Sequence, residues 1–229
     1  MLITLQRSLS TKVAAIIILL STVPQYGILR WPSPMPTIPS STQPSARRIL
    51  RTATAHLHAE VDARFAGSFD GSLADYTGFL SAMAAVLLPL ERALERASVH
   101  MTVPDWDERR RAFLLLDDLQ GLGATPPREL DPPSVEGEAR QLGVVYVLEG
   151  SRIGGKLLLR RALGHPDARV RTATRYLSHG AGRDLWSSFL LRLESSPAVS
   201  SAPDEAVAGA RAAFALFGDR AGHDRVAHG

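Results

Sequence analysis

From Ser45 onward, the chain repeats its core-forming residues at the spacing of an α-helix and shows almost no strand alternation. The first such stretch carries Leu50, Thr54, Leu57, Val61 and Phe65, which recur every three or four positions and so share one helix face. Glycine and proline clusters separate further helical stretches over 73–97, 107–122, 135–163, 183–194 and 204–217. The pattern predicts a single all-α domain of about six or seven helices.

The helical pattern predicts a domain over residues 44–218, preceded by an apolar, proline-rich segment (1–43) and followed by a polar tail (219–229). The apolar run of eleven residues at 13–23 is shorter than a membrane span of about 20 residues. It is compatible with an export signal, a weak membrane anchor, or upstream sequence added by a misassigned start codon. We favour the third interpretation, which predicts a cytoplasmic protein and argues against a membrane partner.

Composition removes several classes of site. The chain has no cysteine, which excludes disulfides, thiolate metal sites and a cysteine nucleophile. The net charge is only +3 and the arginines are scattered between acidic residues, a pattern typical of solvated helix faces and not of a nucleic-acid binder. No histidine follows an acidic residue by three positions, so the Glu-x-x-His pairs of di-iron bundles are missing.

Two histidines lie two residues apart in the first helical stretch, at His56 and His58. Positions two apart on an α-helix point about 200° apart, so the two rings cannot share a face. His58 falls on the side of Thr54, Val61 and Phe65, which faces the predicted core, whereas His56 falls on the polar side. We therefore expect His56 to be exposed and His58 to point inward.

The sequence allows two roles for His58. One is a core histidine whose ring nitrogens are satisfied by neighbours. The other is an axial metal ligand, since a neutral imidazole on an apolar helix face is the usual proximal ligand of heme iron. Arg51 lies two turns earlier on the same face, about 10 Å away, which would let it reach a carboxylate at the edge of a porphyrin. An ordinary surface arginine is the competing interpretation.

A second unusual stretch places Gly143, Gly150 and Gly154 on one stripe of a long helix, with Gly155 beside it. Each interior glycine costs about 1 kcal/mol relative to alanine, so several of them need a reason. Close helix–helix packing is one reason, and close approach of a flat ligand to bare backbone is the other. The spacing does not separate the two.

Together these two stretches resemble the heme oxygenase family, most closely its bacteriophytochrome-associated bacterial branch. The family's proximal helix has a leucine, a basic residue, Ala-Thr and a histidine four positions later, here Leu50, Arg51, Ala53, Thr54 and His58. Its kinked distal helix has a tyrosine followed by glycines, here YVLEGSRIGG from Tyr146 to Gly155, and a phenylalanine of its last helix closes the pocket, here Phe214. The resemblance covers roughly 44–217 and implies a compact helical domain with heme between the two helices.

The resemblance implies oxidative cleavage of heme to biliverdin, carbon monoxide and Fe(II), with heme as both cofactor and substrate and with O2 and external electrons as co-reactants. His58 would be the iron ligand, and the other heme-binding residues would be Arg51, Thr54, Val61, Phe65, Tyr146, Gly155 and Phe214. The implied partners are an electron-donor protein or other reductant, and a bacteriophytochrome as candidate recipient of biliverdin. The alternative is a non-catalytic heme carrier or sensor of the same fold.

The distal helix contains one departure from the family pattern. Gly150 and Gly154 take the catalytic distal positions, where bare backbone leaves room for oxygen. Many members have an aspartate directly after the first of these glycines, which anchors a proton-delivering water network, whereas this chain has Ser151. Ser151 is therefore expected to occupy the place of the distal acid, which leaves the route of proton delivery and the biliverdin isomer open.

Overall fold

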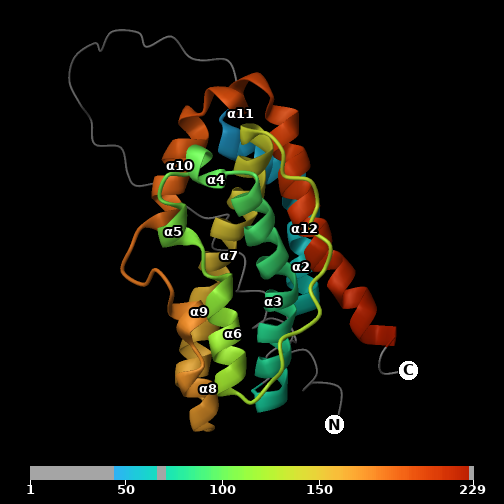
Figure 1. The fold of residues 1–229 in the computed structure, drawn as a ribbon, viewed down its shortest axis with the longest axis vertical. Coiled ribbons are helices and arrows are strands. Elements are labelled where there is room, and N and C mark those ends of the chain that lie inside the picture. Colours follow the sequence, from blue (N-terminus) through green and yellow to red (C-terminus); the bar gives the residue numbers. More distant parts are fainter. Residues whose placement is uncertain (1–43, 66–70, 227–229) are drawn as a thin grey trace, which may run out of the picture. The chain divides into compact units, whose positions relative to one another are not determined.

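The computed structural model describes residues 44–65 and 71–226, and the chain from Ala46 onward forms one compact unit (Figure 1). All regular structure in these ranges is helical, so the predicted all-α class is confirmed. The six longer helices are α2 (Ala46–Phe65), α3 (Leu73–Arg96), α6 (Ala112–Gly121), α7 (Glu138–Leu163), α10 (Leu185–Ser195) and α12 (Pro203–Val226). Between them lie five short ones, α4 (Val99–Thr102), α5 (Trp106–Arg109), α8 (Ala168–Thr172), α9 (Arg175–Ser178) and α11 (Pro197–Ser201).

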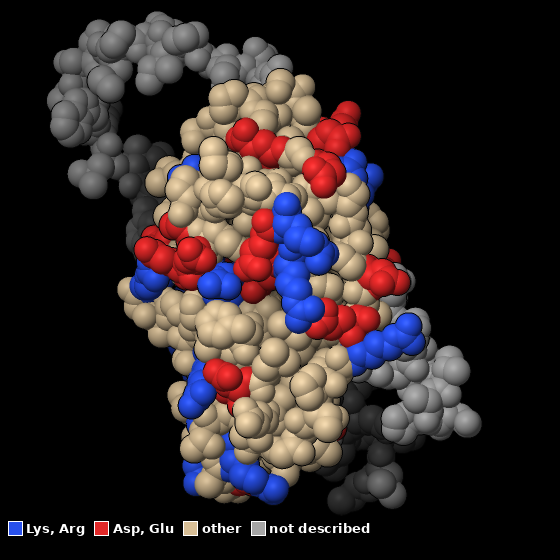
Figure 2. All heavy atoms as spheres, viewed as in Figure 1, with Lys and Arg blue, Asp and Glu red and all other residues tan. Residues whose placement is uncertain are grey.

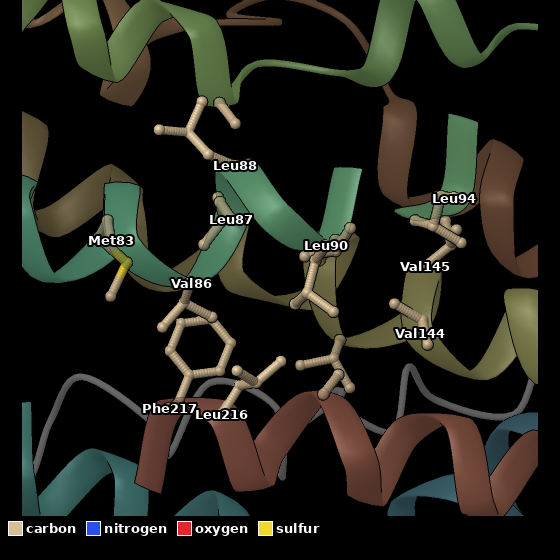
Figure 3. Packing of buried hydrophobic residues seen from close by; sticks show 14 of the residues in the cluster. Met83, Val86, Leu87, Leu88, Leu90, Leu94, Val144, Val145, Leu216 and Phe217 are labelled. Atoms are coloured by element: carbon tan, nitrogen blue, oxygen red, sulfur yellow. The ribbon is translucent and has the colours of Figure 1, made fainter. Parts of the chain in front are cut away.

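The hydrophobic core is built around α3, whose residues from Phe79 to Leu90 are almost all buried. In Figure 3, Phe217 of α12 points toward Val86 of α3 with Leu216 next to it, and Val144 and Val145 of α7 lie together on the side of Leu94. α3 is the one helix of the described ranges that is long and apolar enough to cross a membrane, and most of its apolar stretch is buried. Its apolarity is therefore accounted for by its place at the centre of a packed core.

Among the described helices, α7 and α12 pack together most extensively, and two glycines make this packing possible. A Cβ on Gly143 of α7 would overlap the carbonyl oxygen of Ala206, and a Cβ on Gly209 of α12 would overlap the carbonyl oxygen of Arg140. Each helix thus approaches the other through a residue without a side chain. For Gly143, helix packing is the correct one of the two interpretations left open by the sequence.

One predicted helix is divided in the structure. Residues 107–122 were expected to be continuous, but α5 ends at Arg109 and α6 begins at Ala112. The buried carboxylate of Glu91 causes the new start, because it accepts hydrogen bonds from the backbone N–H groups of Arg111 and Ala112, both at 3.0 Å. A helix start needs acceptors for its first N–H groups, and here a distant side chain supplies them.

The final helix also differs from the expected bounds. α12 continues to Val226, past the Gly218 at which the domain was expected to end.

On the face shown in Figure 2, basic and acidic side chains are interspersed. Ion pairs such as Arg92–Glu129 and Arg140–Glu205 belong to this kind of surface.

Candidate functional site

The helix α2 is held by hydrogen bonds at its N-terminus and near its middle. At its N-terminus, the carboxylate of Glu194 on α10 accepts hydrogen bonds from the backbone N–H groups of Ala46 and Arg47, at 2.9 and 3.0 Å. Further along, Arg211 of α12 donates to the carbonyl oxygen of Ala53 at 3.3 Å. α2 is therefore fixed against α10 and α12.

His58 lies on the face of α2 that is turned toward α12. Its side chain is half-buried, and its ring centroid is 5.7 Å from that of Phe214 on α12, which is itself buried. His56 is exposed, so the exposure of the two rings agrees with the predicted faces. Val61, one turn on from His58, is half-buried, and the side chain of Phe65 lies outside the described residues.

Two residues near His58 have different surroundings. Thr54 is buried, but its hydroxyl donates to the carbonyl oxygen of Leu50 in its own helix at 2.8 Å, so its polar atom is already used. Arg51 is exposed and, with Arg47 one turn before it, lies close enough to Tyr146 of α7 to act on the phenol. Burial raises the pKa of Tyr146, and the positive charges of these two arginines oppose that rise. The N-terminal half of α2 therefore places two positive charges where they act on Tyr146 of α7.

The rest of the glycine stripe on α7 does not share the role of Gly143. A Cβ on Gly150 would lie 3.8 Å from the indole of Trp186 on α10, an ordinary packing distance. A Cβ on Gly155 would contact Leu177 of α9 at 3.6 Å, so this glycine faces the core and not the side of Gly154. Around Gly154, no atom of the described residues lies within 4 Å of an added Cβ. Within the described ranges, no other element therefore covers the side of Gly154 on which a side chain would lie.

The two helices that carry the predicted site share neighbours. α2 and α7 each pack against α10 and α12, while no comparable packing joins α2 to α7 within the described ranges. Among the described residues, no three histidine, aspartate or glutamate side chains are grouped to hold a metal ion. A single half-buried imidazole suits a metal whose other ligands come from a bound group, as in a porphyrin.

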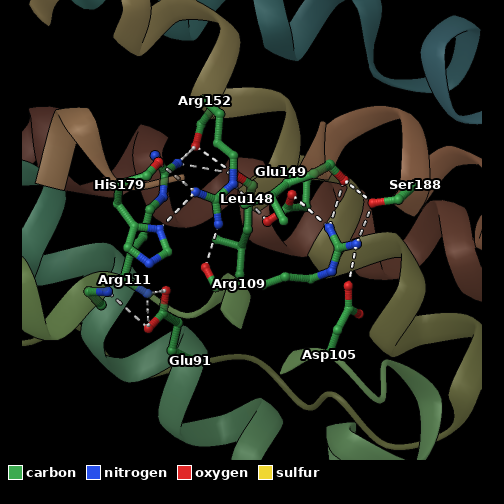
Figure 4. A network of polar contacts seen from close by, with 12 residues as sticks. Glu91, Asp105, Arg109, Arg111, Leu148, Glu149, Arg152, His179 and Ser188 are labelled. Carbon is green, nitrogen blue, oxygen red and sulfur yellow. Dashed lines mark hydrogen bonds and ion pairs between the residues drawn. The ribbon is translucent and has the colours of Figure 1, made fainter. Parts of the chain in front are cut away.

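Ser151 is hydrogen-bonded to a buried polar network in which Figure 4 labels Arg111 and Leu148. Its hydroxyl donates to the carbonyl oxygen of Leu148 and accepts from the guanidinium of Arg111, both at 2.7 Å. Arg111 also stacks over the ring of Tyr176, with 4.6 Å from its central carbon to the ring centroid. The hydroxyl of Ser151 is therefore directed into the protein and has its hydrogen committed.

The second part of the network surrounds Glu149, the residue before Gly150. Its carboxylate, 2% exposed, pairs with Arg109 of α5 at 3.0 Å and with Arg152 at 2.9 Å. Arg109 continues to the carbonyl oxygen of Leu185 and the hydroxyl of Ser188 on α10. These contacts join α5, α7 and α10 at the level of Gly150.

His179 completes this network at the loop after α9. Arg152 donates to its Nδ1 at 3.2 Å, which places the ring hydrogen of a neutral His179 on Nε2. Burial, together with the positive charges of Arg152 and Arg111, lowers the pKa of His179 to about 4. Sequence reasoning missed Arg109, Arg111 and His179, because their partners are distant in the chain and no local spacing connects them.

No family model matches the chain. A protein named heme oxygenase from Xanthomonas campestris pv. campestris is 30% identical over 132 residues, which make up 58% of this chain and 79% of that protein. The solved NO- and CO-bound heme oxygenase of Neisseria meningitidis has the same fold, with a TM-score of 0.63 at 21% identity, covering 77% of this chain and 90% of that one.

Proposed function

The chain belongs to the heme oxygenase family, and on that premise we propose that it binds heme between α2 and α7 and cleaves it to biliverdin, carbon monoxide and Fe(II). The observation that carries this proposal is the half-buried imidazole of His58 on a helix that shares α10 and α12 with α7 but does not pack closely on it. His58 is the proposed axial ligand of the iron, and Phe214 supports its ring from α12.

The described residues fit a porphyrin with two carboxylates. Arg51 and Arg47 lie on the turns of α2 before His58, near the phenol of Tyr146. Cations on flexible side chains at the edge of a site suit propionate groups, which stay partly in water. We assign propionate binding to these two arginines and an edge contact to Tyr146.

On the opposite face, Gly154 offers backbone without a side chain, which supports its proposed place over the heme. When bound, heme supplies the iron and the macrocycle that is cleaved, with O2 and electrons from an external reductant or donor protein. The chain's own residues orient the heme, exclude other ligands and hold the distal backbone in place. Because Gly155 and Thr54 are already engaged within the protein, we assign them to packing and not to heme contact.

Ser151 receives a revised role within this proposal. Its hydrogen is already donated to Leu148, and Arg111 occupies its acceptor side. It therefore ties the turn after Gly150 to the buried network and is not a direct proton donor. The likeness of the Tyr146–Gly155 segment to the phytochrome-associated branch supports a bacteriophytochrome as the recipient of biliverdin.

The assignment of His58 is tested by titrating hemin into the purified protein and into His58→Ala and His56→Ala variants. We expect the wild type and His56→Ala to give the same ligated-heme absorbance, and His58→Ala to lose it, because only His58 points inward. The exposed His56 on the same helix serves as the matched control. Equal loss in both variants, or none in either, would contradict the assignment.

One observation favours the second candidate function, a heme carrier that does not turn over. The residue after Gly150 is a committed hydroxyl and not a carboxylate, so the distal side has no obvious acid at that position. A carrier would bind hemin through His58 but yield no biliverdin with reductant and oxygen.

A further inference from the structure

The side chain that covers Gly150 comes from α10. The far edge of the Trp186 indole, atoms Cζ3 and Cη2, lies 3.8 and 3.9 Å from the position of an added Cβ on Gly150. The same indole lies 5.5 Å from the ring of Tyr146, one turn earlier on α7, measured between centroids. Trp186 therefore covers Tyr146 and Gly150, two successive positions on one face of α7. At the next position on that face, an added Cβ on Gly154 would have no atom of another described element within 4 Å.

The indole is held in this place from behind. Its ring centroid is 6.3 Å from that of Phe189, which is fully buried one turn further along α10. The helix itself is fixed on two sides, since Glu194 of α10 binds the N-terminus of α2 and Arg109 binds the carbonyl oxygen of Leu185. A half-buried aromatic ring wedged between two others, on an anchored helix, keeps its orientation.

We propose that Trp186 is a wall of the heme site: its indole fills the space over Gly150 and confines the heme and any iron ligand to the Gly154 end of α7. This inference rests on the proposed heme site and adds a specificity-determining residue to it. Removing the indole opens a space lined by Tyr146, Gly150 and Phe189, on the side of α7 where an iron ligand would lie.

The wall is tested by the size of the ligand that the ferric heme accepts. Hemin-loaded wild type, Trp186→Ala, Trp186→Phe and Leu191→Ala are titrated with imidazole and with 4-phenylimidazole, and the absorbance gives both dissociation constants. The Phe variant retains an aromatic ring against Phe189 but withdraws the edge that reaches Gly150, so it tests the wall even if the Ala variant does not fold. Leu191 lies on the same helix, 73% exposed, and is the matched control.

We expect both Trp186 variants to bind 4-phenylimidazole at least about tenfold more tightly than wild type, because the opened space is apolar and fits a phenyl ring. Imidazole, which needs no such space, changes by less than about threefold, and Leu191→Ala matches wild type for both. If hemin binds normally but the ratio of the two affinities is unchanged in both Trp186 variants, the wall is refuted while the heme site stands. If the wild type does not bind hemin, the proposed function itself fails, and this inference with it.

Discussion

Substituting Gly143 by alanine tests how closely α7 and α12 approach. The added Cβ would overlap the carbonyl oxygen of Ala206 and lie 2.8 Å from its carbonyl carbon. Both atoms are backbone, so relief requires the two helices to move apart along their longest contact. Overpacking of this kind costs about 1–3 kcal/mol, and a rigid backbone neighbour places this site near 3. Alanine returns about 1 kcal/mol through its better helix propensity, which leaves a net loss of about 2 kcal/mol.

Urea denaturation followed by circular dichroism measures that loss as a lower midpoint at unchanged slope. Gly154→Ala is the matched control on the same helix, because its Cβ would meet no described atom within 4 Å. It is expected to raise the stability of the heme-free protein by up to about 1 kcal/mol, yet to weaken hemin binding. A Gly143→Ala protein as stable as the wild type would refute the close approach, and a destabilised Gly154→Ala would refute the division of the stripe into packing and ligand-facing glycines.

Two further perturbations probe the buried network. Glu149→Ala removes one of the two carboxylates on the guanidinium of Arg109, 2% exposed, and leaves Asp105 at 2.8 Å. The free energy of unfolding should therefore fall by about 1–3 kcal/mol. Glu129→Ala, in a partly exposed ion pair, should cost less than about 1 kcal/mol. An equally small loss in Glu149→Ala would mean that its pair with Arg109 is not buried. His179 has a folded pKa near 4 against an ordinary value of 6.5, so the unfolded chain binds more protons between these values and stability falls as the pH is lowered from 6.5 toward 4. His179→Gln should lose less stability than the wild type between pH 7 and pH 5, and parallel curves would show that burial and the charges of Arg152 and Arg111 do not keep the ring neutral.

The sequence sufficed for the features that depend on local spacing. The long helices follow from apolar periodicity with glycine and proline breaks, and the inward direction of His58 follows from helix geometry alone. The family resemblance then joined His58 to the stretch around Gly150, which periodicity could not do.

What the sequence could not provide are contacts between residues far apart in the chain. The break before α6 depends on Glu91, twenty positions earlier along the chain. The separate roles of Gly143, Gly150 and Gly154 depend on Ala206, on Trp186 and on open space, none of which is encoded in the spacing of the glycines. The pairing of Glu149 with Arg109 likewise spans 40 positions.

The most direct test of the central claim is a single-turnover experiment on the hemin-loaded protein. Reductant and oxygen are added, the heme absorbance is followed, and the pigment and iron released are measured. We expect the heme band to disappear with a matching rise of biliverdin and one iron per heme, and His58→Ala to show neither above the background of free hemin. A wild-type protein that binds hemin through His58 but leaves it intact under these conditions would contradict the proposed activity and establish a heme carrier instead.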